Sequence, residues 1–313
     1  MNIVVTDSGF GGLGIAARLY ESLKSHNSTE TIDIIFVNGL PYEKYGYNSF
    51  LDEKLKINVF NNLLVNINQK IKPDLIVIAC NTLSVLFNKT KIYSEIKSKV
   101  IDIIEFGTEK VIQIHKSESN ALLAILGTKT TIYSEVHRSY FQKYPCIFSD
   151  VLAIPCTELV TAIEDDFESM ETKSIIKSCV NKIGMKFVDS NYSKLFLILA
   201  CTHFPYVEHI FRHYLDKLDI SYTLINPNYF MIKSIENIFR DRLKTVPNVP
   251  GKIKISIISK TVITNQKIES ISMLIKNISE DTITALHDYR HIPDFFLTEI
   301  GSNILNRSNI PSN

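Results

Sequence analysis

The feature of this sequence that most constrains its fold is the alternation of short aliphatic runs with longer segments of helical periodicity. Parallel strands need a long crossover, usually a helix, to bring the chain back to the same edge of a sheet. The alternation therefore predicts an α/β fold with doubly wound parallel sheets. Strands are expected near residues 3–6, 32–37, 75–79, 100–104, 121–126, 149–152, 195–200 and 222–225.

Bulk properties exclude several classes of protein. The 313 residues suffice for one large or two medium domains, and the formal net charge is only +1. Because no run of Lys and Arg is long enough to track a phosphate backbone, no nucleic-acid partner is predicted. The richest apolar run, 195–201, is far shorter than the roughly 20 residues that span a membrane, so no membrane contact is predicted.

The cysteines and the first residues indicate the compartment. The five cysteines form an odd set without CxxC spacing, which argues against a disulfide framework or a zinc site. The sequence opens directly on an apolar run, without the basic and long apolar stretches of a secretion signal. A reducing, cytoplasmic setting and no bound metal are therefore expected.

Polar clusters follow three of the expected strands. They read Asp7-Ser8-Gly9, Cys80-Asn81-Thr82 and Cys201-Thr202-His203. In open parallel sheets, ligands bind beyond the carboxyl ends of the strands, so a site is expected where these clusters meet. The two cysteine clusters follow similar apolar strands, which suggests two comparable halves that face each other.

A glycine motif follows the first expected strand. The run Gly9-Phe10-Gly11-Gly12-Leu13-Gly14 satisfies the G-x-G-x-x-G pattern of dinucleotide sites. Such sites carry an acidic residue at the end of the next strand, where this sequence has Val37-Asn38-Gly39. The alternative is a tight turn whose amides bind an anion such as a carboxylate at a helix N-terminus. The sequence favours this second interpretation, and no cofactor is predicted.

The chemistry of thiols makes Cys80 and Cys201 candidate catalytic groups. A thiol with an ordinary pKa of about 8.5 works near neutrality as an acid or a base. Inversion of an amino-acid α-carbon needs two such groups, one on each face of the carbon. Free cysteines are also common as small buried hydrophobes, and this role is expected for Cys146, Cys156 and Cys179. For Cys80 and Cys201 the residues alone leave both interpretations open.

Three motifs occur in collinear order: Thr6-Asp7-Ser8-Gly9-Phe10-Gly11-Gly12-Leu13, Ile78-Ala79-Cys80-Asn81-Thr82 and Ala200-Cys201-Thr202-His203-Phe204-Pro205. Weaker matches lie at 104–107, 126–132 and 159–164, so that together they cover roughly residues 1–245. On these motifs the chain resembles the aspartate/glutamate racemase superfamily, and most closely glutamate racemase.

The resemblance implies two pseudo-symmetric α/β lobes with the active site between them. The first lobe would comprise 1–98 and 208–248, the second 99–207, and 249–313 would form a C-terminal elaboration packing on the first lobe. The activity implied is that of an isomerase: cofactor-independent racemisation of L- and D-glutamate, supplying D-glutamate for peptidoglycan. Family members are often dimers, so a homodimer is a further expectation.

The resemblance also assigns roles to individual residues. Cys80 and Cys201 would be the paired bases, with Asp7 assisting Cys80 and His203 with Glu164 assisting Cys201. The ammonium and carboxylates of the substrate would be held by Ser8, Tyr45, Gly46, Asn81, Thr82, Thr128, Thr131 and Thr202.

The assisting residues also have simpler interpretations. Asp7 could cap the helix that follows the glycine turn, and His203 could be a hydrogen-bonded structural residue. Glu164 lies beside Asp165 and Asp166, and such an acidic run is usually a solvated helix face.

The chain departs from the family pattern in the loop after the second strand. The Pro-Tyr-Gly of the family is split here: an ungapped match uses Tyr45-Gly46, whereas a gapped match uses Pro41-Tyr42. Later, Asn226 stands where the family usually has Asp. The changed loop leaves open an aspartate or other amino-acid racemase and a catalytically degenerate dicarboxylate-binding protein. A third alternative is a one-thiol decarboxylase or cis–trans isomerase on the same fold, and the presence of both cysteines argues against the decarboxylase. A dithiol redox protein is a fourth.

Overall fold

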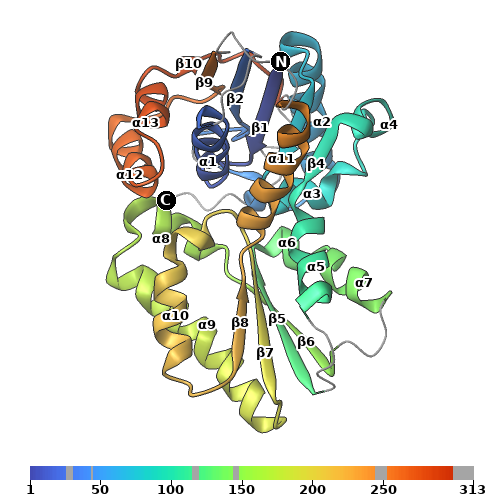
Figure 1. The fold of residues 1–313 in the computed structure, drawn as a ribbon, viewed down its shortest axis with the longest axis vertical. Helices are drawn as coiled ribbons and strands as arrows, with labels where there is room; N and C mark the ends of the chain where they lie inside the picture. The colour runs from blue at the N-terminus through green and yellow to red at the C-terminus, as the bar shows by residue number, and fades with distance from the viewer. Residues whose placement is uncertain (26–30, 44, 115–119, 144–147, 244–251, 299–313) are drawn as a thin grey trace.

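A computed structural model of the chain describes residues 1–25, 31–43, 45–114, 120–143, 148–243 and 252–298. Two lobes lie one above the other, each built around its own parallel sheet (Figure 1). We call the elements around the six-stranded sheet the first lobe and those around the four-stranded sheet the second lobe. Both sheets carry helices on their two faces, so the predicted α/β fold with doubly wound parallel sheets is confirmed.

The sheet of the first lobe is parallel throughout. Its strands, in spatial order, are β10 (Arg290–His291), β9 (Ile253–Ser259), β2 (Ile32–Asn38), β1 (Asn2–Asp7), β3 (Leu75–Ile78) and β4 (Val100–Asp102). One face is covered by α1 (Leu13–Lys24), α11 (Pro227–Leu243), α12 (Asn265–Ile275) and α13 (Glu280–His287). The other face is covered by α2 (Glu53–Asn66), α3 (Asn81–Phe87) and α4 (Tyr93–Ile96).

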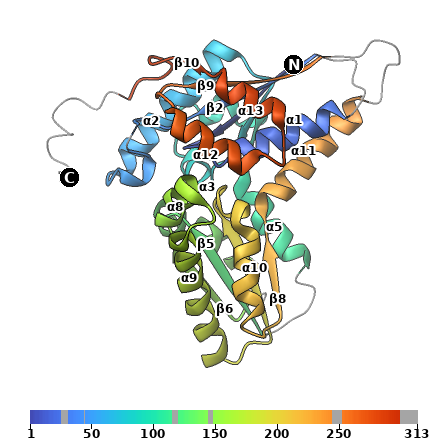
Figure 2. The same ribbon diagram turned by 90° about the vertical axis from the view of Figure 1, so that its left-hand side faces the viewer.

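The sheet of the second lobe has the order β6 (Asp150–Pro155), β5 (Ala121–Gly127), β7 (Lys194–Ala200) and β8 (Tyr222–Ile225). On one face lie α8 (Glu158–Asp166), α9 (Met170–Asp189) and α10 (Glu208–Asp216); Figure 2 shows α9 and α10 side by side, with α8 above α9. On the other face lie α5 (Ile103–Ile114), α6 (Lys129–Tyr133) and α7 (Val136–Gln142). None of the helices in the described ranges is long and apolar enough to cross a membrane.

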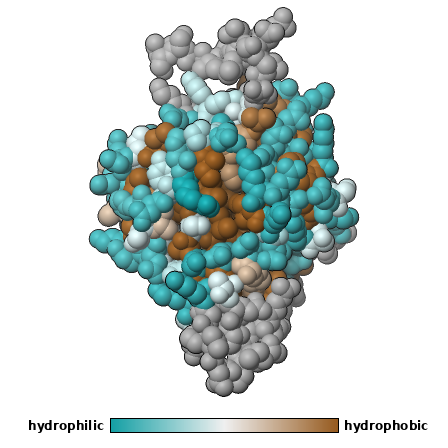
Figure 3. Space-filling view, turned by 90° about the horizontal axis from the view of Figure 1, so that it is seen from above, coloured by the Kyte–Doolittle hydropathy of each residue, from teal (hydrophilic) through white to brown (hydrophobic). Residues whose placement is uncertain are grey.

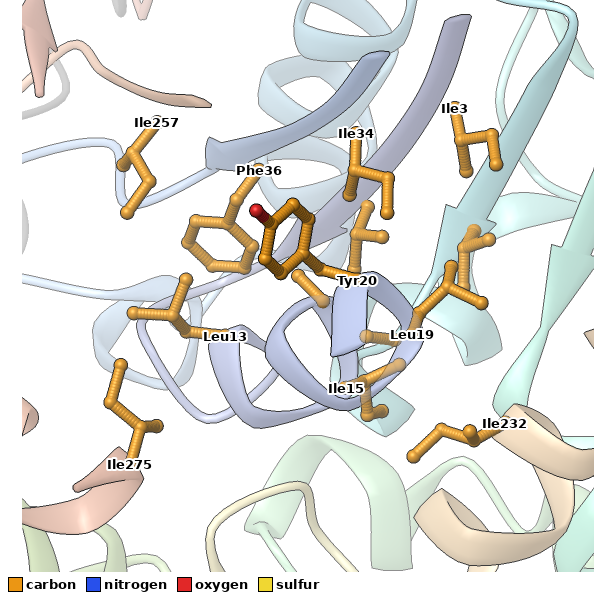
Figure 4. Packing of buried hydrophobic residues seen from close by; sticks show 14 of the residues in the cluster. Ile3, Leu13, Ile15, Leu19, Tyr20, Ile34, Phe36, Ile232, Ile257 and Ile275 are labelled. Carbon is orange, nitrogen blue, oxygen red and sulfur yellow. The ribbon is translucent and has the colours of Figure 1, made fainter. Parts of the chain in front are cut away.

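The hydrophobic core between the first sheet and α1 consists of alternate residues of the strands and of the apolar residues along one side of α1. Ile34 and Phe36 point from the sheet toward Leu13 and Leu19 of α1 (Figure 4). Full burial of an aliphatic or aromatic side chain contributes roughly 1.5–3 kcal/mol, so these residues fix α1 firmly on the sheet. Outside the core, the end of the molecule beside the first sheet shows apolar residues near its centre with hydrophilic residues around them (Figure 3).

The expected strands are all present, but two predicted lobe limits differ from the strand pairing. The sequence predicts a return to the first lobe at residue 208, yet α10 packs against α9 and β8 pairs with β7. The chain therefore returns only at α11. Similarly β4, predicted within the second lobe, pairs with β3.

The C-terminal segment also differs from its description as an elaboration. Its residues 253–259 form β9, which pairs with β2 along its whole length and is therefore an integral strand of the first sheet. The helices α12 and α13 follow it and cover the same face as α1. Residues 249–251 and 299–313 of the predicted segment lie outside the described residues.

Candidate active site

A cavity of about 460 Å³ lies between the two lobes. The carboxyl ends of β1 and β3 reach it from the first lobe, and those of β5 and β7 reach it from the second. Asp7, Cys80, Thr128 and Cys201, which lie at or just after these strand ends, therefore line the same cavity. The expectation that the polar clusters meet beyond the strand ends is therefore confirmed.

The glycine turn after β1 allows the lobes to approach each other closely. A Cβ atom at Gly11 would lie 2.3 Å from Thr202 Oγ1 and 2.5 Å from His203 Nδ1. At Gly12 it would lie 2.8 Å from Asp7 Oδ2. Since real Cβ contacts are longer, this turn has a steric need for glycine that involves no dinucleotide.

Cys80 lies at the N-terminus of α3 among hydroxyl and carboxyl groups. The Ser8 hydroxyl lies 3.0 Å from the Cys80 sulfur and donates a 3.3 Å hydrogen bond to Asp7 Oδ1. The other oxygen of Asp7 accepts a 2.8 Å hydrogen bond from the Thr202 hydroxyl. Burial, and then the negative charge of Asp7, raise the pKa of the Cys80 thiol well above its usual range. Asp7 thus contacts residues beside both cysteines.

Cys201 lies beside His203, which in turn contacts Glu164. Its sulfur lies 3.9 Å from His203 Nδ1, and His203 Nε2 lies 2.7 Å from Glu164 Oε1. Burial alone would lower the pKa of His203, but hydrogen bonds with Cys201 and Glu164, together with their charges, raise it to about 10. Burial would raise the pKa of Glu164, but His203 and Lys267 lower it to about 2. At neutral pH the site therefore holds an imidazolium beside Cys201.

Threonine hydroxyls and one amide line the wall between the cysteines. Thr82 Oγ1 of the first lobe lies 2.8 Å from Thr128 Oγ1 of the second, which lies 3.1 Å from Thr131 Oγ1. Thr131 is buried behind Thr128 and does not line the cavity. Asn81 is 2% exposed, and neither Nδ2 nor Oδ1 of its side chain has a hydrogen-bond partner within the described part of the chain. Because an unpaired buried amide is costly, Asn81 is suited to a polar ligand.

In the loop after β2, one residue predicted for the site does not line the cavity. Gly46 lines the cavity as predicted, but Tyr45 does not, and this residue is 39% exposed. The chain turns into a short helix, η1 (Tyr47–Ser49), which places Tyr47 and Asn48 on the cavity wall instead. The Asn48 side chain also accepts a hydrogen bond from the Thr130 amide, so the loop joins the two lobes.

The segment after β9 supplies cavity residues that sequence reasoning missed. Thr261, Thr264 and Lys267 line the cavity from the first lobe. No local motif marks them, because they reach the site only through the pairing of β9 with β2. Without that strand, the segment reads as a peripheral one.

The remaining cysteines lie elsewhere. Cys156 and Cys179 are buried in the second-lobe core with their sulfurs 2.7 Å apart, and neither lines the cavity. Cys146 lies outside the described residues. Nowhere in the described ranges do three His, Cys, Asp or Glu side chains form a group that could hold a metal ion.

Known proteins resemble this chain in sequence. No family model matches it. Glutamate racemase 3 of Caldanaerobacter subterraneus subsp. tengcongensis is 29% identical over 206 residues, which is 66% of this chain and 67% of the relative.

Solved structures resemble it in fold. Glutamate racemase from Francisella tularensis in complex with D-glutamate matches with a TM-score of 0.66 and 24% identity over 89% of this chain and 95% of the other. Escherichia coli glutamate racemase, in complex with L-glutamate and the activator UDP-MurNAc-ala, matches with a TM-score of 0.61 and 14% identity over the same shares. The predicted resemblance to glutamate racemases is therefore confirmed.

Proposed function

We propose that this protein is a glutamate racemase that interconverts L- and D-glutamate by proton transfer between two thiols, without a cofactor. One observation carries the proposal: Cys80 and Cys201 come from different lobes and line the same cavity, each with its own polar partners. The relatives from F. tularensis and E. coli, which were solved with D-glutamate and L-glutamate respectively, support this substrate.

The reaction needs one base and one acid on opposite faces of the α-carbon. One cysteine, as thiolate, removes the α-proton, and the electron pair of the broken C–H bond remains on the substrate as a carbanion stabilised by hydrogen bonds to its carboxylate. The opposite thiol then donates its proton to the other face. The two cysteines end with their protonation states exchanged, so the reverse reaction starts directly from the product state.

Cys80 and Cys201 have different neighbours, and we assign these neighbours different roles in the proton transfer. In this proposal Asp7 takes up or returns a proton near Cys80 through Ser8, and His203, which contacts Glu164, stabilises negative charge that forms on Cys201 during the reaction. The substrate ammonium and carboxylates would contact the cavity-lining residues Ser8, Gly46, Asn81, Thr82, Thr128 and Thr202. Thr131 would act through Thr128.

The cellular role follows from the resemblance. The D-glutamate formed would supply peptidoglycan synthesis in the cytoplasm. A homodimer remains a prediction.

Circular dichroism of each glutamate enantiomer, incubated with the protein, tests the proposal. The wild type should bring both enantiomers to zero ellipticity, whereas Cys80→Ser and Cys201→Ser should each lose at least about a hundredfold in rate, as removal of an acid or base usually costs. Cys179→Ser is the matched control, because Cys179 lies in the second-lobe core away from the cavity, and should retain activity.

The outcomes separate the alternatives. Turnover of aspartate in place of glutamate would correct the substrate, and binding of glutamate without racemisation by folded wild type would refute the proposal in favour of a dicarboxylate-binding protein. Unchanged rates in both cavity-cysteine variants would refute the two-thiol mechanism.

A further inference from the structure

Both carboxylate oxygens of Glu164 are engaged by charged groups. Oε1 lies 2.7 Å from His203 Nε2, and Oε2 lies 2.6 Å from Lys267 Nζ. The side chain of Glu164 is 14% exposed and that of Lys267 is 28% exposed, so this is a largely sheltered contact. Ion pairs at such positions are screened less than surface pairs.

Lys267 reaches Glu164 from the other lobe. It lies in the first turn of α12, where Thr264 caps the helix by accepting a hydrogen bond from the Lys267 amide. The next turn of α12 also contacts α8, since the Ser270 hydroxyl donates to the Glu164 carbonyl. Figure 2 shows α12 directly above α8. The backbone around Lys267 is thus fixed at two points relative to Glu164.

The charges around this contact favour a role in holding Glu164. Among the described residues that line the cavity, Lys267 is the one lysine or arginine. The other charged group near its ammonium is Asp165, whose Oδ1 lies 3.9 Å away and whose side chain is 72% exposed. Since the Asp165 carboxylate is mostly solvated, the shorter and more buried contact with Glu164 governs where the ammonium lies.

We propose that Lys267 is a positioning residue for the Cys201 half of the reaction: it holds Glu164 in place and ionised, so that Glu164 holds a charged His203 against Cys201. The inference rests on the proposed racemase function and adds a fourth member to the chain that leads from Cys201. Lys267 itself need not touch the substrate. Its influence on the pKa of Glu164, which it lowers, agrees with the geometry.

The test compares Lys267→Met with Lys267→Arg and with Lys276→Met. Lys276 is an exposed lysine at the C-terminal end of the same helix and does not line the cavity, so its variant controls for loss of a charge on α12. Lys267→Met should lower kcat/KM by roughly tenfold, the lower end of the loss found when an outer partner of a metal ligand is removed. Lys267→Arg should restore most of this loss, and Lys276→Met should match wild type.

The α-deuterium isotope effects of the two enantiomers distinguish a role of Lys267 at Cys201 from a general loss of structure, which would not change them in opposite directions. A racemase has an equilibrium constant of one, so kcat/KM must fall equally for both enantiomers. The α-deuterium isotope effects need not be equal, because a slower proton transfer at Cys201 becomes the limiting step. In Lys267→Met the effect should rise for the enantiomer whose α-hydrogen faces Cys201 and fall for the other.

Several results would overturn the proposal. They are an unchanged kcat/KM, an increase in KM alone, which would make Lys267 a substrate-binding residue, and equal changes of the two isotope effects. Thermal unfolding of each variant checks that the fold is intact. Failure of the proposed function is distinguishable, because it would appear in wild type as absence of racemisation.

Discussion

The two halves of the cavity resemble each other in backbone and differ in chemistry. In both, a largely buried parallel strand is followed by a cysteine and then by polar residues. Cys80 faces a serine hydroxyl and the Asp7 carboxylate, whereas Cys201 faces an imidazolium that is held by the Glu164 carboxylate, which the Lys267 ammonium contacts in turn. A repeated fold thus presents two thiols in opposite electrostatic environments. Burial and the charge of Asp7 raise the pKa of the Cys80 thiol and so favour its protonated form, whereas the Cys201 half places a positively charged imidazole beside the sulfur.

The largest effects should come from removing the assisting group of one half at a time. His203→Asn should lower kcat/KM on the order of a hundredfold, because it removes the imidazolium beside Cys201. Asp7→Asn should have an effect of similar size through Cys80. Isotope effects with α-deuterated substrates should increase for opposite enantiomers in the two variants, and an increase for the same enantiomer would show that the halves are not independent.

A smaller effect should appear in stability against pH. The folded protein raises the pKa of His203 from 6.5 to about 10, so it binds this proton more tightly than the unfolded chain. The stabilisation is complete below pH 6.5 and is lost as the pH rises through about 10. Urea unfolding should therefore show the stability difference between wild type and His203→Asn shrinking by a few kcal/mol over that range, at about 1.4 kcal/mol per pKa unit.

The exposed ion pair between His209 and Glu168 provides the control for this measurement, because its N–O distance equals that between His203 and Glu164. His209 Nε2 also lies 2.7 Å from a carboxylate, that of Glu168, but their side chains are 58% and 48% exposed. Solvent screening makes such pairs weak, so His209→Asn should show almost no change across the same pH range. Equal pH dependence in both variants would contradict the account of His203.

The smallest effect should come from the contact that joins the halves. Thr82→Val removes the 2.8 Å hydrogen bond with Thr128 across the lobes and should cost about 1 kcal/mol of stability, together with an increase in KM. Thr108→Val is the matched control, because the Thr108 hydroxyl donates only within α5. It should lose similar stability with KM unchanged. Equal changes of KM in the two variants would contradict a role of Thr82 in substrate binding.

The sequence was sufficient for those parts of the site that local pattern determines. Strand ends followed by Asp7, Cys80 and Cys201 could be predicted, because parallel strands bring their carboxyl ends to one edge. Glu164 shows the limit of composition: its acidic neighbour Asp165 is 72% exposed, as a solvated run predicts, whereas Glu164 turns inward and is 14% exposed. Helical periodicity separates neighbours in this way, and only the tertiary partner decides which one is buried.

The parts that could not be predicted depend on contacts distant in sequence. Lys267 meets Glu164 across 103 positions because β9 joins the edge of β2. The limits of the lobes depend on the pairing of β8 with β7, which its short apolar run does not specify. The motif match predicts Tyr45 at the site, whereas the local turn at η1 places Tyr47 on the cavity wall instead.

The central claim is that two thiols act on opposite faces of one carbon, and racemisation in D₂O tests it most directly. At early times, with either enantiomer as substrate, the product should carry deuterium at the α-position while the remaining substrate keeps its hydrogen, because the proton returned comes from a different thiol that has exchanged with solvent. The account would be contradicted if deuterium entered recovered substrate as fast as product, since a single base would then serve both faces.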